Sequence, residues 1–248
     1  MRTANPALSA KTFTDIPRIV DPARVMTIQG TVNKTLLMLV FVLIPAVWVW
    51  HTFFTSGNPQ AIMPWLYGGL IGGFIVALVT IFKKQWSPFT APLYSVLEGL
   101  AIGGISAFFE AQFPGIVIQA VALTFGTLLC LLLVYKSGII KVTENFKMGV
   151  VAATGGVALI YVITIVIGFF GIRMPYIHES GTIGIIFSLI VVIIAALNLV
   201  LDFDFIEKGA AAGAPKFMEW YAAFGLMITL IWLYLEILRL LAKTSGRR

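Results

Sequence analysis

Long apolar runs, separated by short polar stretches, fill the chain from about residue 35 to near its end. A helix needs about 20 mostly apolar residues to cross the hydrocarbon core of a membrane. Strands of a membrane barrel would instead alternate apolar and polar positions, and the run GIIFSLIVVIIAALNLVL at 184–201 does not alternate. The pattern therefore predicts an all-α membrane protein, a bundle of seven transmembrane helices. The predicted spans are about 35–54, 62–82, 91–110, 116–135, 148–171, 182–204 and 217–242.

Polar segments flank these spans. Residues 1–33 are polar, contain Pro6, Pro17 and Pro22, and have no apolar core of the kind found in a cleavable signal peptide. We expect them to form a flexible N-terminal arm. Residues 34–244 are predicted to be the seven-helix membrane domain, and residues 245–248 a basic tail.

Lysine and arginine positions predict the orientation. With the N-terminus inside, most basic residues of the arm and loops fall on the inner side, and the outer loops hold only Arg173. This asymmetry follows the positive-inside rule and predicts a cytoplasmic N-terminus. The C-terminal basic residues break it, so the last segment is either a full crossing with a basic outer tail or a re-entrant segment. Those residues are Arg239, Lys243, Arg247 and Arg248.

Composition narrows the function classes. Hydrophobic residues make up 59% of the chain and charged residues 11%, compared with about 25% charged residues in soluble domains. The formal net charge is +6, but the basic residues lie between apolar runs and form no patch for nucleic acid. The expected partner is the lipid bilayer. Cys130 is alone, so neither an intrachain disulfide nor a cysteine metal site is expected.

Glycines at four-residue spacing mark helix faces that can approach a neighbour closely. The pairs are Gly68 with Gly72, Gly69 with Gly73, and Gly99 with Gly103. Small residues at this spacing favour close packing of helices in lipid. They indicate packing and carry no information about transport.

Acidic residues near or within the spans need an explanation, because a charge at membrane depth costs at least ~2.5–3.5 kcal/mol and usually faces the bundle interior. Several have an ordinary alternative explanation. Glu236 can pair with Arg239 one helical turn later. Three others can sit at the membrane interface, namely Glu110, Asp204 and Glu219. Asp202 and Glu98 are the hardest to explain in this way. The full set is Glu98, Glu110, Asp202, Asp204, Glu219 and Glu236.

The last two spans form a hairpin whose midpoint falls near residue 211. Asp202 and Glu219 lie at similar distances from this midpoint, so the two carboxyl groups are predicted to face each other. Two carboxyl groups brought together in a low dielectric can share a proton. Such a pair would act as a pH-sensitive latch, and Asp202 is also a candidate for binding Ca²⁺. Lys83 or Lys84 would supply the counter-charge.

The stretch LNLVLDFDFIEKG at 197–209, together with LYLEILRLL at 233–241, resembles the transmembrane Bax inhibitor motif (Bax inhibitor-1-like) family. Leu97-Glu98-Gly99 is similar to a further element of that family. The resemblance covers spans two to seven, and the polar arm looks like an extension found in a bacterial branch. It implies seven spanning helices in a bacterial inner membrane.

The resemblance also implies a function, a pH-sensitive calcium leak channel with no cofactor and with Ca²⁺ as the permeant ion. The family associates this activity with two aspartates in the last two helices and a basic residue near the end of helix two. Asp202 matches the first aspartate, and Lys83 or Lys84 matches the basic position. The motif letters place the second acid at Glu236, whereas the hairpin places it at Glu219, and either way a glutamate replaces the aspartate.

Other function classes remain open. A regulatory or scaffolding protein that binds other membrane proteins and conducts no ions would also suit the glycine faces. An enzyme is not expected, because the only two histidines lie on the predicted outer side, His51 near the end of the first span and His178 in a loop, and no metalloprotease motif is present.

Overall fold

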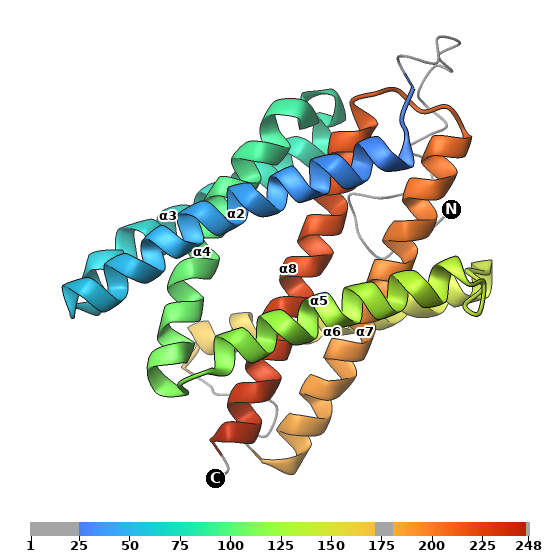
Figure 1. The fold of residues 1–248 in the computed structure, drawn as a ribbon. Coiled ribbons are helices and arrows are strands. Elements are labelled where there is room, and N and C mark those ends of the chain that lie inside the picture. The colour runs from blue at the N-terminus through green and yellow to red at the C-terminus, as the bar shows by residue number, and fades with distance from the viewer. Residues whose placement is uncertain (1–24, 172–180, 247–248) are drawn as a thin grey trace. The chain divides into compact units, whose positions relative to one another are not determined.

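The computed structural model describes residues 25–171 and 181–246. Seven of its helices are long and apolar enough to cross a membrane, which confirms the predicted all-α, seven-helix membrane fold of an integral multi-pass protein. Figure 1 colours them from blue to red in chain order. The elements are α2 (Ile28–Ser56), η2 (Pro59–Ile62), α3 (Met63–Phe82), η3 (Lys84–Trp86), α4 (Ser87–Gln112), α5 (Ile116–Lys136), α6 (Glu144–Phe169), α7 (Thr182–Ala211) and α8 (Met218–Ser245).

The first helix begins earlier than the apolar pattern predicts, at Ile28 rather than near residue 35. Thr27 has an extended backbone, and its hydroxyl accepts a hydrogen bond from the Gly30 amide, which is the usual N-cap arrangement. Residues 28–33 of the predicted arm are therefore helical. Residues 1–24 of that arm, Arg173 and His178 between α6 and α7, and the tail residues 247–248 lie outside the described residues.

The last helix is long enough for a full crossing. α8 contains 28 residues, which at ~1.5 Å per residue measure about 42 Å, more than the ~30 Å hydrocarbon core. A re-entrant segment would need a turn inside this length, and the helix is continuous from Met218 to Ser245. The full seventh crossing is the interpretation that this length favours.

The chain divides into two compact units, and the division falls within α7 and α8. We call the described residues 25–114 and 205–228 the α2–α4 unit. The second, the α5–α6 unit, comprises the described residues 115–171, 181–204 and 229–246. Asp202 and Asp204 thus belong to the α5–α6 unit, and Glu219 to the α2–α4 unit. Each unit is described by itself below.

In the α2–α4 unit, α4 packs against both α2 and α3. A β-carbon added at Gly103 would lie 2.5 Å from the Ala46 carbonyl oxygen of α2, and one added at Gly69 would lie 2.6 Å from the Leu97 carbonyl oxygen of α4. Only glycine allows backbones to approach this closely. The predicted packing role of the glycine pairs is confirmed for these two positions.

Many large apolar side chains lie on the outer faces of the helices, among them Ile44, Phe74, Ile118 and Leu159. In a water-soluble protein such exposure would be costly, but lipid tails are as apolar as these side chains. The polar side chains of α7 and α8, in contrast, are largely buried, including Asp202, Glu219, Thr229 and Glu236. The polar and ionisable side chains of α7 and α8 therefore lie mostly in the interior of the units.

A candidate ion site between α6, α7 and α8

Asp202 is a buried carboxyl group without a normal hydrogen bond. Its side chain is 1% exposed, and neither of its oxygens has a hydrogen-bond partner in the part of the chain that the structure describes. The Thr229 side chain of α8 is the polar group that interacts with it, outside normal hydrogen-bond geometry. Residues 198–204 of α7 are all buried. A buried polar group without a partner is rare in native proteins and calls for a functional explanation.

A contact at the other end of the α5–α6 unit defines the register of α7 against α8. The Lys243 ammonium donates hydrogen bonds to the Ser188 hydroxyl at 2.8 Å and to the Gly184 carbonyl oxygen at 3.1 Å. Asp202 lies fourteen positions after Ser188, and Thr229 lies fourteen positions before Lys243. In an antiparallel pair of helices the same register therefore places Thr229 opposite Asp202. The Lys243–Ser188 contact and the interaction of Asp202 with Thr229 therefore indicate the same register of α7 against α8.

Helix α6 adds three polar contacts to this pair. Its buried Lys147 lies 3.3 Å from Asp204 Oδ2, Asn198 donates to the Thr154 hydroxyl at 2.8 Å, and the Tyr161 hydroxyl donates to Glu236 Oε1 at 2.8 Å. Lys147, Thr154 and Tyr161 are seven residues apart, which places them on one face of the helix. We call these contacts, together with Asp202, Thr229 and the Lys243–Ser188 hydrogen bond, the α6–α7–α8 seam.

Glu236 is buried in the seam, but it is well satisfied. Arg239 donates to both of its oxygens, at 2.8 and 2.9 Å, and the Trp232 indole donates to it at 3.2 Å. Arg239 also donates to the Tyr161 hydroxyl at 2.8 Å. The alternative that Glu236 pairs with Arg239 is thus the observed arrangement. No described hydrogen bond joins Glu236 to Asp202.

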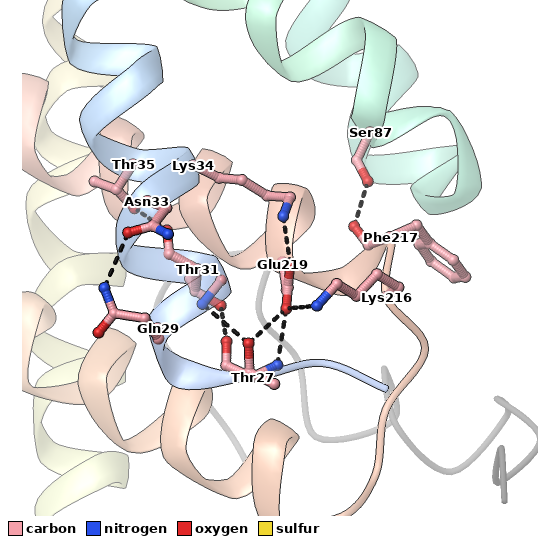
Figure 2. Close-up of polar contacts among 11 residues, drawn as sticks. Thr27, Gln29, Thr31, Asn33, Lys34, Thr35, Ser87, Lys216, Phe217 and Glu219 are labelled. Carbon is pink, nitrogen blue, oxygen red and sulfur yellow. Dashed lines mark hydrogen bonds and ion pairs between the residues drawn. The ribbon is translucent and has the colours of Figure 1, made fainter. Parts of the chain in front are cut away.

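Glu219 is the centre of a separate polar cluster in the α2–α4 unit, drawn in Figure 2. Its carboxylate is fully buried. The amide and hydroxyl of Thr27 donate to Oε1 at 2.9 and 2.8 Å, Lys216 pairs with Oε1 at 2.9 Å, and Lys34 donates to Oε2. Through these hydrogen bonds and ion pairs, Glu219 at the start of α8 binds the residues at the start of α2.

Two hydrogen bonds to backbone carbonyl oxygens join further segments at the same end of the α2–α4 unit. The Met26 amide donates to the Ala214 carbonyl oxygen at 2.6 Å, and the Ser87 hydroxyl at the start of α4 donates to the Phe217 carbonyl oxygen at 3.0 Å (Figure 2). The predicted pairing of Glu219 with Asp202 crosses between the two units and stays a prediction. The contacts within the α2–α4 unit give Glu219 a structural role.

The remaining predicted site residues lie at other places. Glu98 is half-buried on α4, close to Gly73 of α3, and interacts with Tyr94. Asp204 faces Lys147 of α6. Lys83 is exposed, and the Lys84 ammonium lies 5.8 Å from the centre of the Tyr221 ring. The assignment of either lysine as counter-charge to Asp202 stays a prediction.

Asp202 is also the predicted candidate for binding Ca²⁺. Within residues 25–171 and 181–246, no group of three or more histidine, cysteine, aspartate or glutamate side chains could hold a metal ion. Ca²⁺ also binds backbone carbonyl and water oxygens, so the assignment of Asp202 as a Ca²⁺ ligand stays a prediction. The Asp202 carboxyl group is buried and lies near the Thr229 side chain of α8.

Lys147 is the functional candidate that sequence reasoning missed. The predicted fifth span began at residue 148, so Lys147 was assigned to a loop, whereas α6 begins at Glu144 and buries Lys147 to 1% exposure. A usable signal was present. Thr143 followed by Glu144 is a helix-start pattern, and the seven-residue spacing of Lys147, Thr154 and Tyr161 marks one face.

Comparison with known proteins gives one match. The family model described as Bax inhibitor 1 like matches residues 4–246, which is nearly the whole chain. No curated protein and no solved structure matches this chain. The match includes the α7 and α8 segments on which the resemblance was based, and the seven spanning helices agree with it. The chain belongs to the Bax inhibitor 1 like family.

Proposed function

We propose that this protein is a passive, pH-sensitive leak channel for cations, permeable to Ca²⁺, and that the protonation state of Asp202 gates it. The observation that carries this proposal is the position of Asp202, buried in the seam with no normal hydrogen bond. Ionisable groups inside membrane proteins commonly line ion and proton routes. The family's association of an aspartate in the sixth helix with calcium leak supports the same residue.

The physical basis is the cost of an unpaired charge. An ionised carboxylate in a low dielectric costs several kcal/mol even after the protein relaxes. A closed seam accommodates the neutral carboxyl group of Asp202 at lower cost than the carboxylate. Ionisation of Asp202 therefore favours an arrangement in which a cation or water reaches it, and protonation favours the closed seam. The proposed leak is faster at higher pH.

The polar groups of the seam extend over a large part of the membrane thickness. From Ser188 to Asp204 on α7 there are sixteen residue steps, about 24 Å of helix, compared with about 30 Å of hydrocarbon. The seam includes partners from α6 and α8 along this length. A route that opens along the seam would need few further polar groups to cross the bilayer.

The proposed location is the plasma membrane of a bacterium, with the N-terminus in the cytoplasm. The support for this orientation is the distribution of lysine and arginine. Two of the residues that break the distribution are engaged in the seam, since Arg239 binds Glu236 and Lys243 binds Ser188. Because Arg239 and Lys243 are engaged in these contacts, they weigh less against the predicted orientation than the sequence alone indicates.

The test is Ca²⁺ flux into proteoliposomes across a range of pH values. We expect the wild-type protein to leak faster as pH rises, and Asp202→Asn to leak slowly at every pH because its side chain cannot ionise. Glu207→Gln is the matched control, since Glu207 is an exposed carboxylate on the same helix, and it should behave as the wild type. Flux that does not differ between wild type and Asp202→Asn would disprove the gate, and protein without flux would disprove the channel and favour a scaffold.

A further inference from the structure

We propose that the Lys147 ammonium is a tethered cation that closes the inner end of the seam to other cations. This inference rests on the proposed leak and deepens it, because it names the residue that excludes cations from Asp202 in the closed state. It does not depend on which acid, Glu219 or Glu236, serves as a second sensor.

The contacts of Lys147 come from two helices. Its Nζ lies 2.9 Å from Glu144 Oε1 on α6 and 3.3 Å from Asp204 Oδ2 on α7. The Glu144 side chain is 69% exposed, whereas that of Asp204 is 11% exposed. The ammonium therefore bridges a carboxylate that is in contact with the exterior and a carboxylate that faces the interior.

The position is unfavourable for a lysine unless something compensates for it. Lys147 lies near the first turn of α6, where the helix dipole disfavours a positive charge, and its side chain is 1% exposed. Buried charges are normally paired, and here carboxylates from α6 and α7 provide the pairing. An apolar side chain at position 147 would need no such pairing. The presence of a buried ammonium group there therefore requires an explanation.

The location gives the cation a role. Asp204 lies two residues beyond Asp202, toward the end of α7 that is predicted to face the cytoplasm. Tyr135 of α5 packs against Phe203 between them, with ring centres 5.8 Å apart. A cation that enters the seam from this end meets the ammonium before it reaches Asp202. Carboxylate oxygens are the ligands that Ca²⁺ prefers, and Lys147 occupies the place between two of them.

The experiment compares initial rates of Ca²⁺ entry into proteoliposomes. We expect Lys147→Met to raise the leak rate about tenfold, because the positive charge that repels an entering cation is lost. Lys147→Arg keeps the charge and should leak at the wild-type rate. Lys141→Met removes an exposed lysine from the loop before α6 and is the matched control, with no expected change.

The outcomes separate this inference from the proposed function. If the wild type leaks with the expected pH dependence and folded Lys147→Met leaks at the same rate, the tethered cation is wrong and the channel stands. If no variant leaks, both proposals are wrong. Should Lys147→Met fail to fold, Glu144→Gln replaces it, since this exposed side chain anchors the ammonium; a two- to threefold increase, roughly, is expected, and an unchanged rate overturns the inference.

Discussion

The Lys243 ammonium donates a hydrogen bond to the Ser188 hydroxyl at 2.8 Å, and both groups are buried within the α5–α6 unit. This contact joins the C-terminal part of α8 to the N-terminal part of α7. Because both helices are regular, it also determines the register of their other residues in this unit. Thr229 faces Asp202 for this reason, fourteen positions away on each helix.

Removal of this contact should destabilise the α5–α6 unit. We expect Ser188→Ala to lower the free energy of unfolding by ~1–3 kcal/mol, because the buried ammonium would lose a hydrogen-bond partner. The measurement is thermal or denaturant unfolding in detergent. Thr244→Ala is the control, since its exposed hydroxyl bonds only to the preceding turn of its own helix, and a change as large as that for Ser188→Ala would contradict the expectation.

Gly30 should not tolerate even a methyl group. A β-carbon at Gly30 would collide with the Glu219 carboxylate, which is packed between α2 and its partners in the α2–α4 unit (Figure 2). We expect Gly30→Ala to destabilise the protein by ~1–3 kcal/mol, since overpacking costs that much.

The matched control for this substitution is Gly68→Ala. A β-carbon at Gly68 of α3 meets nothing within 4 Å, so the substitution should be neutral or should stabilise the helix by up to about 1 kcal/mol. Both variants are compared by their unfolding midpoints in the same detergent. Equal midpoints for the two variants would show that Glu219 does not hold α2 in the way described.

Glu236 and Arg239 should be coupled in a double-mutant cycle. Arg239→Gln leaves the Glu236 carboxylate buried with only the Tyr161 and Trp232 donors, and breaking a buried charge pair is costly. We expect it to destabilise the protein by ~1–3 kcal/mol, less than a fully buried pair because the Arg239 side chain is 39% exposed.

The double variant Glu236→Gln with Arg239→Gln should recover part of that stability, since no buried charge then remains unpaired. The unfolding free energies of the two single variants and the double variant give the coupling. Strictly additive effects would mean that the pair contributes nothing. In that event Glu236 would again be a candidate for the second acid of the latch.

The apolar pattern by itself determined the number and the approximate bounds of the spanning helices, because the hydrocarbon thickness requires a minimum length of apolar residues. It also determined which acids needed an explanation, since the cost of a charge in lipid does not depend on its neighbours along the chain. Asp202 was identified in this way. The glycine faces followed from four-residue spacing for the same local reason.

The partners of these acids were decided only by the tertiary structure. The hairpin midpoint near residue 211 predicts that Asp202 and Glu219 lie at similar depth, but it gives no indication that Thr229 lies opposite Asp202, which the Lys243–Ser188 contact indicates. The register depends on how the loop residues and the helix faces pack, and sequence separation does not contain that information. Lys147 was missed for a related reason. The predicted span began at residue 148, four residues after the start of α6 at Glu144, and so left Lys147 in a loop, although tertiary packing buries it beside Asp204.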